Sequence, residues 1–169
     1  MVISKNKEDI SLQLKRVKIF SDFDQNFFDI FIPHLQIKEW KQGHSIIIEG
    51  DVGENMFFVL RGRVRIIKKT LSKEEYTVAI LKDEQGIFFG EVGLLTKDER
   101  SATVKAENDC LLAELDHTRF NDFLKKYPNY GVEFLKRLSV SICQKLKKSN
   151  QDTLTLYQAL VHEIGESYL

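Results

Sequence analysis

Glycine is concentrated in the middle of the chain, and this placement constrains the fold more than any other feature. Seven of the nine glycines lie between Gly43 and Gly93, and the other two are Gly131 and Gly165. Glycine is common in turns and is avoided in helix interiors. The distribution therefore predicts strands and turns in the middle of the chain, with helices at both ends.

Short apolar segments occupy this glycine-rich middle, and many are separated by Gly, Asp, Asn, Lys or Ser. They read SIIIEG, MFFVLRG, RVRIIKK, EYTVAIL, ATVKA and CLLAEL. In RVRII, Val64 and Ile66 alternate with Arg63 and Arg65, which is the pattern of a half-buried strand. Several short strands at close spacing favour an antiparallel sandwich or barrel.

The two ends of the chain carry helical patterns. In residues 7–35, the segment DQNFFDIFIPHL gathers phenylalanines on one side of a short helix, which Pro33 ends or bends. After the last apolar segment, Asp116 is a candidate N-cap for a further short helix with a phenylalanine-rich face. Pro128 then separates that helix from a long final helix.

The final helix has an apolar stripe with one polar interruption. Its members follow steps of three and four, with one position skipped: Leu138, Ile142, Leu146, Leu154, Tyr157, Val161 and Ile164. Ser149 and Asn150 lie where the stripe should continue. Either this turn is solvated or frays, or it faces a polar ligand or a polar group of a partner. The stripe indicates that the helix docks on the strand region, on a second copy of the chain, or on both.

Composition favours a soluble cytoplasmic protein with one domain over residues 1–169. Lys and Arg total 25, as do Asp and Glu, so the formal net charge is zero and weighs against a nucleic-acid binder. The N-terminus lacks the apolar region of a signal peptide, and no segment is long enough to span a bilayer. Cys110 and Cys143 lie in apolar-rich segments, and we expect buried free thiols in a reducing compartment rather than a disulfide between them.

The segment FFGEVGLLTKDERSATV combines groups that suit a phosphate. Gly90 begins a tight turn into a short helix, whose first N–H groups attract anions, and small residues let a ligand approach the backbone. Arg100 presents a planar fork that holds two phosphate oxygens. Ser101 adds a hydroxyl donor, and Ala102 offers its amide without side-chain bulk. Together these groups predict an anion-binding site.

Glu91 does not suit a phosphate alone, because a carboxylate repels it. It fits a ligand that carries a hydroxyl beside the phosphate, as ribose does, while Arg100 balances its charge. Taken singly, Glu91 is more often a solvated turn residue, Arg100 a surface charge and Gly90 an ordinary turn. The combination favours a cyclic nucleotide as the ligand.

Residues 89–106, FGEVGLLTKDERSATVKA, resemble the phosphate-binding cassette of the cyclic nucleotide-binding domain family. That family includes catabolite-activator-type regulators, kinase regulatory subunits and nucleotide-gated channels. A second family signature is IIIEGDVGENMFFVLRG, with its spaced glycines. The resemblance covers nearly the whole chain and implies a mainly β fold with flanking α-helices. It places N-terminal helices in about 1–38, an antiparallel β-roll or jelly-roll in about 39–116, and C-terminal helices, the last one long, in about 117–169.

The resemblance also implies a set of ligand-binding residues. They are Ile66, Ile80, Phe89, Gly90, Glu91, Val92, Arg100, Ser101, Ala102, Ser149 and Asn150. Gly90 and Glu91 are expected on the ribose side, with Val92 offering its backbone or packing beneath the sugar. Arg100 is expected on the exocyclic phosphate oxygens. The base is expected against the two isoleucines, and Ser149 and Asn150 match a polar pair that touches adenine in catabolite-activator-like proteins.

The implied function is regulatory rather than enzymatic, with no catalytic cofactor and no metal. Ser101 favours cAMP, because a threonine there accompanies a preference for cGMP in some family members. We expect the nucleotide to shift the C-terminal helix, which also offers a homodimer contact, and to act on a downstream protein that the sequence does not identify. Nucleic acid and membrane are not expected partners. The chain ends at Leu169 without a helix-turn-helix, so transcription-factor activity by this chain alone is not expected.

Two other functions fit parts of the same pattern. The first is a protein-interaction or dimerisation module that has lost its ligand, although the presence of Glu91, Arg100 and Ser101 argues against it. The second is a cupin-like metalloenzyme, which needs clustered ligands. The four histidines show no such spacing: His34, His44, His117 and His162.

Overall fold

The computed structural model describes residues 6–82 and 86–166. Contacts divide the chain into two compact units, Met1–Gly131 and Val132–Leu169. The first contains every described strand, and the second consists of most of the final helix. The prediction of a single domain over 1–169 stays a prediction.

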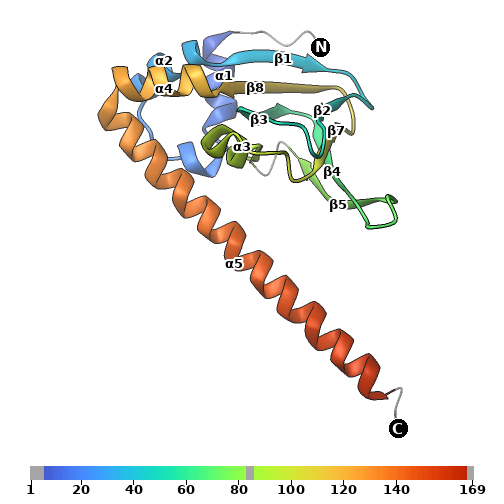
Figure 1. Ribbon diagram of the computed structural model, residues 1–169. Coiled ribbons are helices and arrows are strands. Elements are labelled where there is room, and N and C mark those ends of the chain that lie inside the picture. Colours follow the sequence, from blue (N-terminus) through green and yellow to red (C-terminus); the bar gives the residue numbers. More distant parts are fainter. Residues whose placement is uncertain (1–5, 83–85, 167–169) are drawn as a thin grey trace. The chain divides into compact units, whose positions relative to one another are not determined.

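Among the described residues, two antiparallel four-stranded sheets form the centre of the first unit (Figure 1). One sheet has the order β1-β8-β3-β6, with β1 Gln36–Trp40, β8 Cys110–Asp116, β3 Asn55–Arg61 and β6 Phe88–Phe89. The other has the order β2-β7-β4-β5, with β2 Ser45–Ile47, β7 Thr103–Ala106, β4 Arg63–Lys69 and β5 Glu75–Lys82. This arrangement confirms the predicted antiparallel β-roll.

Helices precede, interrupt and follow the strands. They are α1 Lys7–Leu14, α2 Gln25–Phe31, α3 Glu91–Thr96, α4 His117–Lys126 and α5 Pro128–Glu166, with 3₁₀ turns at Lys18–Phe20 and Ile32–His34. The carboxylate of Asp116 accepts a hydrogen bond from the amide of Arg119 at 2.9 Å and caps α4, as predicted. The amide of Phe27 likewise donates to Asp24, at 2.8 Å, at the start of α2. The long final helix that begins at Pro128 is confirmed.

The structure differs from the sequence interpretation in two strands and one thiol. Strand β1 begins at Gln36, inside the region assigned to N-terminal helices, and β6 was not predicted at all. Both cysteines are free, and Cys110 is buried as expected. Cys143 is exposed, however, so the expectation of two buried thiols was wrong for this residue.

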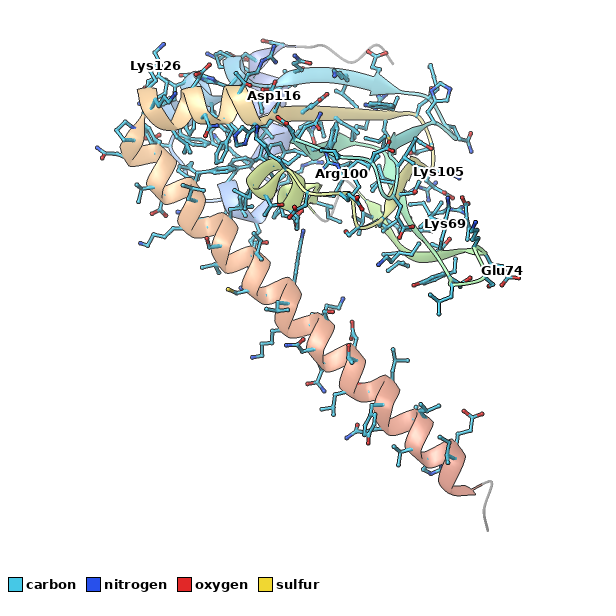
Figure 2. All side chains as sticks on the ribbon, viewed as in Figure 1. Lys69, Glu74, Arg100, Lys105, Asp116 and Lys126 are labelled. Atoms are coloured by element: carbon cyan, nitrogen blue, oxygen red, sulfur yellow. The ribbon has the colours of Figure 1, made fainter. Side chains whose placement is uncertain are left out.

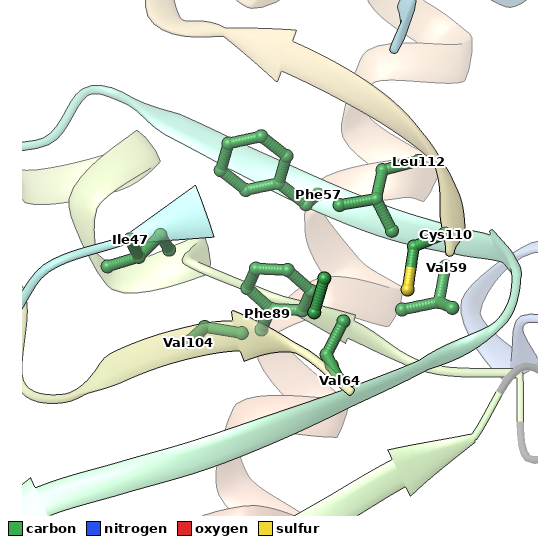
Figure 3. Close-up of a cluster of buried hydrophobic side chains, with 9 residues drawn as sticks. Ile47, Phe57, Val59, Val64, Phe89, Val104, Cys110 and Leu112 are labelled. Atoms are coloured by element: carbon green, nitrogen blue, oxygen red, sulfur yellow. The ribbon is translucent and has the colours of Figure 1, made fainter. Parts of the chain in front are cut away.

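The core of the roll draws side chains from both sheets. It contains Ile47, Phe57, Val59, Val64, Phe89, Val104, Ala106, Cys110 and Leu112 (Figure 3). The rings of Phe57 and Phe89 stack with centroids 5.3 Å apart. Phe58 faces the other side of β3, where its ring lies 5.0 Å from that of Phe20. Because both faces of β3 are covered, its residues 56–60 are buried without interruption. This burial holds β3 in place, and the strand begins at Asn55.

The second unit exposes one apolar face of α5. Its exposed large side chains include Leu146, Leu154, Leu156, Tyr157, Leu160, Val161 and Ile164. Asn150 lies on the same face as Leu146 and Leu154, with which it lines a shallow groove. The polar interruption predicted from the sequence is therefore part of this face. Of the helices within the described ranges, none is both long enough and apolar enough to cross a membrane.

Candidate functional site

Main-chain hydrogen bonds bring two distant segments together at Arg100. The amide of Arg100 donates to the carbonyl of Asp51 at 2.8 Å, and the amide of Gly50 donates to the carbonyl of Arg100 at 2.9 Å. A further bond, of 3.4 Å, joins the amide of Gly53 to the carbonyl of Asp98. The two glycine-rich signatures of the sequence therefore meet at this arginine, which lies beside α3 (Figure 2).

The Arg100 side chain is buried and held by three hydrogen bonds. Nη1 donates to the carbonyl of Gly90 at 3.1 Å, and Nη2 donates to the carbonyl and to Oδ1 of Asn55 at 2.8 and 2.9 Å. A guanidinium has five N–H groups, so three bonds leave the Nε–H and one Nη1–H for another acceptor. The residue is 8% exposed, which makes these donors more effective than they would be in water.

Three glycines make room for the Arg100 guanidinium. A Cβ at Gly53 would lie 1.9 Å from Nε, and a Cβ at Gly93 would lie 2.5 Å from Nη1. A Cβ at Gly90 would lie 3.0 Å from Nη1, and this glycine also has φ +82°, which favours the absence of a side chain. The sequence interpretation assigned small residues in the cassette, Gly90 and Gly93 among them, to clearance for a ligand and gave Gly53 no such role. The structure shows that all three glycines first give clearance to the arginine.

Two buried carboxylates raise the pKa of Arg100 against the effect of burial. Burial of the guanidinium lowers the pKa of Arg100, and the negative charges of Glu114 and, more weakly, Glu91 oppose that effect. Glu91 was predicted from the sequence, and it is buried in the first turn of α3. Glu114 was missed. Its one sequence signal is a carboxylate within the apolar run CLLAEL.

The other predicted cassette residues differ in accessibility. Ser101 is exposed, Ala102 is half-buried, and Val92 is exposed beside the buried Glu91. Phe89 places its side chain in the core of the roll, so its contribution to a ligand site would come from its main chain. The structure therefore brings Gly90, Glu91 and Arg100 together, with Ser101 next to them in the chain.

The two isoleucines expected to contact the base lie on opposite faces of their sheet. In the β4–β5 register, Ile66 pairs with Ala79 and Ile80 pairs with Arg65. Directly paired residues share a face and successive residues alternate, so Ile66 and Ile80 point to different sides. Ile66 packs against the core, and Ile80 is 44% exposed. We therefore expect one of them, rather than both, to contact a given ring.

Ser149 and Asn150 belong to the second unit, where both are exposed on α5. Their expected contact with adenine stays a prediction.

Metal binding has no candidate site within residues 6–82 and 86–166. No group of three or more His, Cys, Asp or Glu side chains in these ranges could hold a metal ion. His117 instead links two helices, because its Nδ1 lies 2.9 Å from the carbonyl oxygen of Leu94 at the end of α3.

A protein-family model described as the cyclic nucleotide-binding domain matches residues 37–127, more than half of the chain. Among curated proteins, the human potassium/sodium hyperpolarization-activated cyclic nucleotide-gated channel 1 is 33% identical over 140 residues. That alignment covers 83% of this chain and 15% of the channel. The chain thus spans a small part of the length of the curated relatives it matches.

Two solved structures extend the likeness. The catabolite activator protein of Thermus thermophilus is 26% identical, with a TM-score of 0.73 over 82% of this chain and 62% of that one. The regulatory domain of Toxoplasma gondii PKA, solved with cAMP, is 30% identical, with a TM-score of 0.61 over 72% of this chain and 46% of that one. Both have the same β-roll architecture.

Proposed function

Because the chain belongs to the cyclic nucleotide-binding domain family, we propose that it is a regulatory module that binds cAMP in preference to cGMP. The observation that carries the proposal is the buried Arg100, which is held by three hydrogen bonds and keeps two N–H donors for a further acceptor. The cAMP complex of the Toxoplasma relative supports the same ligand class. The family is a ligand-binding one, and the absence of catalysis by this chain is part of the proposal.

Each part of the nucleotide has a counterpart in the first unit. The remaining N–H groups of Arg100 and the exposed hydroxyl of Ser101 bind the phosphate, with the main chain of Ala102. Glu91 accepts a hydrogen bond from the ribose hydroxyl, and the exposed Ile80 packs on the base. A charge-assisted hydrogen bond in a buried site contributes about 1.5–3 kcal/mol, so Arg100 supplies the largest single share.

The proposal is tested by calorimetric titration of the purified chain with cAMP and with cGMP. We expect tighter binding of cAMP, and Arg100→Ala should weaken it at least about tenfold. Lys97→Ala is the matched control, because this exposed cation on the same loop pairs with Glu54 rather than with the site. No heat and no thermal shift with either nucleotide at millimolar concentration would exclude the ligand. An unchanged affinity in Arg100→Ala would place the site elsewhere.

The regulatory part of the proposal is a change in the placement of α5 when the nucleotide binds, with Ser149 and Asn150 contributing to recognition of the base. A ligand shifts such an equilibrium only by its difference in affinity for the two states. Cys143 is an exposed thiol on α5 and Cys110 is buried, so a nitroxide label should attach to Cys143. Addition of cAMP should change the spin-label spectrum, and Arg100→Ala should abolish that change. If saturating cAMP leaves the spectrum unaltered, the proposed change in the placement of α5 is wrong.

A homodimer through α5 and a downstream protein partner complete the proposal. The exposed apolar face of α5 supports the dimer, and it equally suits a ligand-free dimerisation module of the same fold, which is the second candidate. The titration separates the two, because a ligand-free module binds neither nucleotide. A cytoplasmic location is also proposed, and the exposed free thiol of Cys143 fits a reducing compartment.

A further inference from the structure

Glu114 places a carboxylate on the core-facing side of β8. Side chains alternate across a strand, so Cys110, Leu112 and Glu114 share one face, and the first two belong to the core of the roll. Glu114 is 7% exposed. A buried carboxylate is costly unless charges and hydrogen bonds compensate it, so its partners define what it does.

Two neighbouring strands supply these partners. Lys38 of β1 places Nζ 2.5 Å from Oε2 of Glu114, and Asn55 of β3 donates a hydrogen bond from Nδ2 to Oε1. In the register, Glu114 pairs with Gln36 on one side and with Phe57 on the other. Lys38 and Asn55 lie two residues from those positions, on the same face, so the sheet itself brings them to the carboxylate.

Asn55 connects Glu114 to Arg100. Its Oδ1 accepts a hydrogen bond from Nη2 of Arg100 at 2.9 Å, and its main-chain oxygen accepts from the same atom at 2.8 Å. Because the side-chain amide donates to Glu114 and accepts from Arg100, the two bonds together fix which way the amide points. With both hydrogens of Nη2 engaged, the guanidinium cannot turn without breaking them.

We propose that Asn55 and Glu114 are positioning residues for Arg100: Glu114 orients the Asn55 amide, and the amide holds the guanidinium so that its Nε–H and one Nη1–H face the phosphate. The inference rests on the proposed function, in which Arg100 binds that phosphate, and it extends the site to two residues outside the cassette. The negative charge of Glu114 also opposes the effect of burial on the pKa of Arg100.

The first arm of the test measures phosphate recognition. The probes are cAMP and its two phosphorothioate diastereomers, in which sulfur replaces one or the other exocyclic oxygen. A fixed guanidinium should distinguish the two diastereomers in the unmodified protein. Asn55→Ala should weaken cAMP binding about tenfold and bring the two diastereomer affinities close to equality, which a general loss of stability would not do. Asn129→Ala, which alters an exposed asparagine in the first turn of α5, is the control.

The second arm needs no nucleotide. The NMR signal of the Arg100 Nη2 hydrogens, assigned by its absence in Arg100→Lys, should be resolved and slow to exchange in the unmodified protein, because both hydrogens are bonded to Asn55. Asn55→Ala should remove it, and so should Asn55→Asp, which sets a second carboxylate against Glu114. The double variant Asn55→Asp with Glu114→Gln should restore the signal, because the new amide donates to the new carboxylate.

The outcomes distinguish a failure of the proposed cAMP binding from a failure of the positioning roles of Asn55 and Glu114. A protein that binds no cyclic nucleotide, yet loses the Arg100 signal in Asn55→Ala and regains it in the double variant, would refute the proposed function and support the positioning roles. An unchanged signal and an unchanged diastereomer ratio in a folded Asn55→Ala would overturn the positioning roles, even with cAMP binding intact. Thermal unfolding checks the fold, and Asn55→Ser replaces Asn55→Ala if the latter does not fold.

Discussion

Gly53 packs directly on the Arg100 guanidinium, so closely that a Cβ at position 53 would lie 1.9 Å from Nε and 2.2 Å from Cζ. Gly53→Ala must therefore displace the arginine, which is buried and bonded to Asn55 and Gly90. We expect a loss of cAMP affinity comparable to that of Arg100→Ala, about tenfold or more. Calorimetric titration and thermal unfolding of the same sample measure the effects on binding and on stability.

Gly50→Ala is the control for this prediction. Gly50 has φ +87°, but a Cβ there meets no atom within 4 Å. This variant should strain the backbone, at a cost of about 1 kcal/mol of stability, while leaving the arginine in place. Equal losses of affinity in the two variants would show that backbone strain, not displacement of Arg100, weakens binding.

The opposite orientations of Ile66 and Ile80 predict opposite effects of truncating them. Ile66→Ala removes a side chain that packs against the core and should lower the free energy of unfolding by about 2 kcal/mol or more. Ile80→Ala alters a side chain that is 44% exposed and should change stability by about 0.5 kcal/mol or less, yet weaken cAMP binding. Urea unfolding and titration test both. Nucleotide affinity that falls in Ile66→Ala and not in Ile80→Ala would assign the base contact to Ile66.

Strands were predictable where an apolar run reports burial directly. Strand β3 is buried on both faces, and its run of five apolar residues, MFFVL, indicates this burial in the sequence. Strand β1 was not predictable in the same way, because it lies at a sheet edge and exposes Lys38 and Glu39. Strand β6 is two residues long, too short for any period to appear.

The candidate site divides along similar lines. Gly90, Glu91 and Arg100 are close in sequence, so their chemistry could be combined before the fold was known. Asn55 and Glu114 are 59 residues apart, and only the β3–β8 register brings them together. Neither carries a local signal of its connection to Arg100. The clearance role of Gly53 was hidden for the same reason.

The lowered pKa of His34 predicts that the stability of the fold depends on pH. Burial lowers the pKa of His34 below its usual value of 6.5, and the positive charge of Lys126 lowers it further, against the opposing charge of Asp122. The unfolded chain therefore binds this proton at a higher pH than the folded chain does. The free energy of unfolding should rise as pH increases from the folded pKa to 6.5 and fall on acidification through the same window.

Urea unfolding at several pH values measures this contribution. His34→Gln should flatten the dependence in that window, because it removes the group that titrates. His44→Gln changes an exposed histidine before β2 and leaves His34 intact, so it should keep the slope of the unmodified protein. If the free energy of unfolding of His34→Gln depends on pH as steeply as that of the unmodified protein, His34 does not cause the pH dependence.

The apolar face of α5 predicts a dimer that one substitution weakens. Leu146, Leu154 and Tyr157 are exposed on α5, and a second copy of the chain offers a matching stripe. Leu154→Glu should remove about 1.5–3 kcal/mol of apolar burial per copy and shift the protein toward monomer in sedimentation equilibrium. Thr155→Glu adds the same charge one residue away, on a different side of the helix, and should leave the dimer intact. A protein that sediments as a monomer at its highest soluble concentration, with and without cAMP, would contradict this prediction. If both variants dissociate the dimer equally, the dimer contact does not run through Leu154.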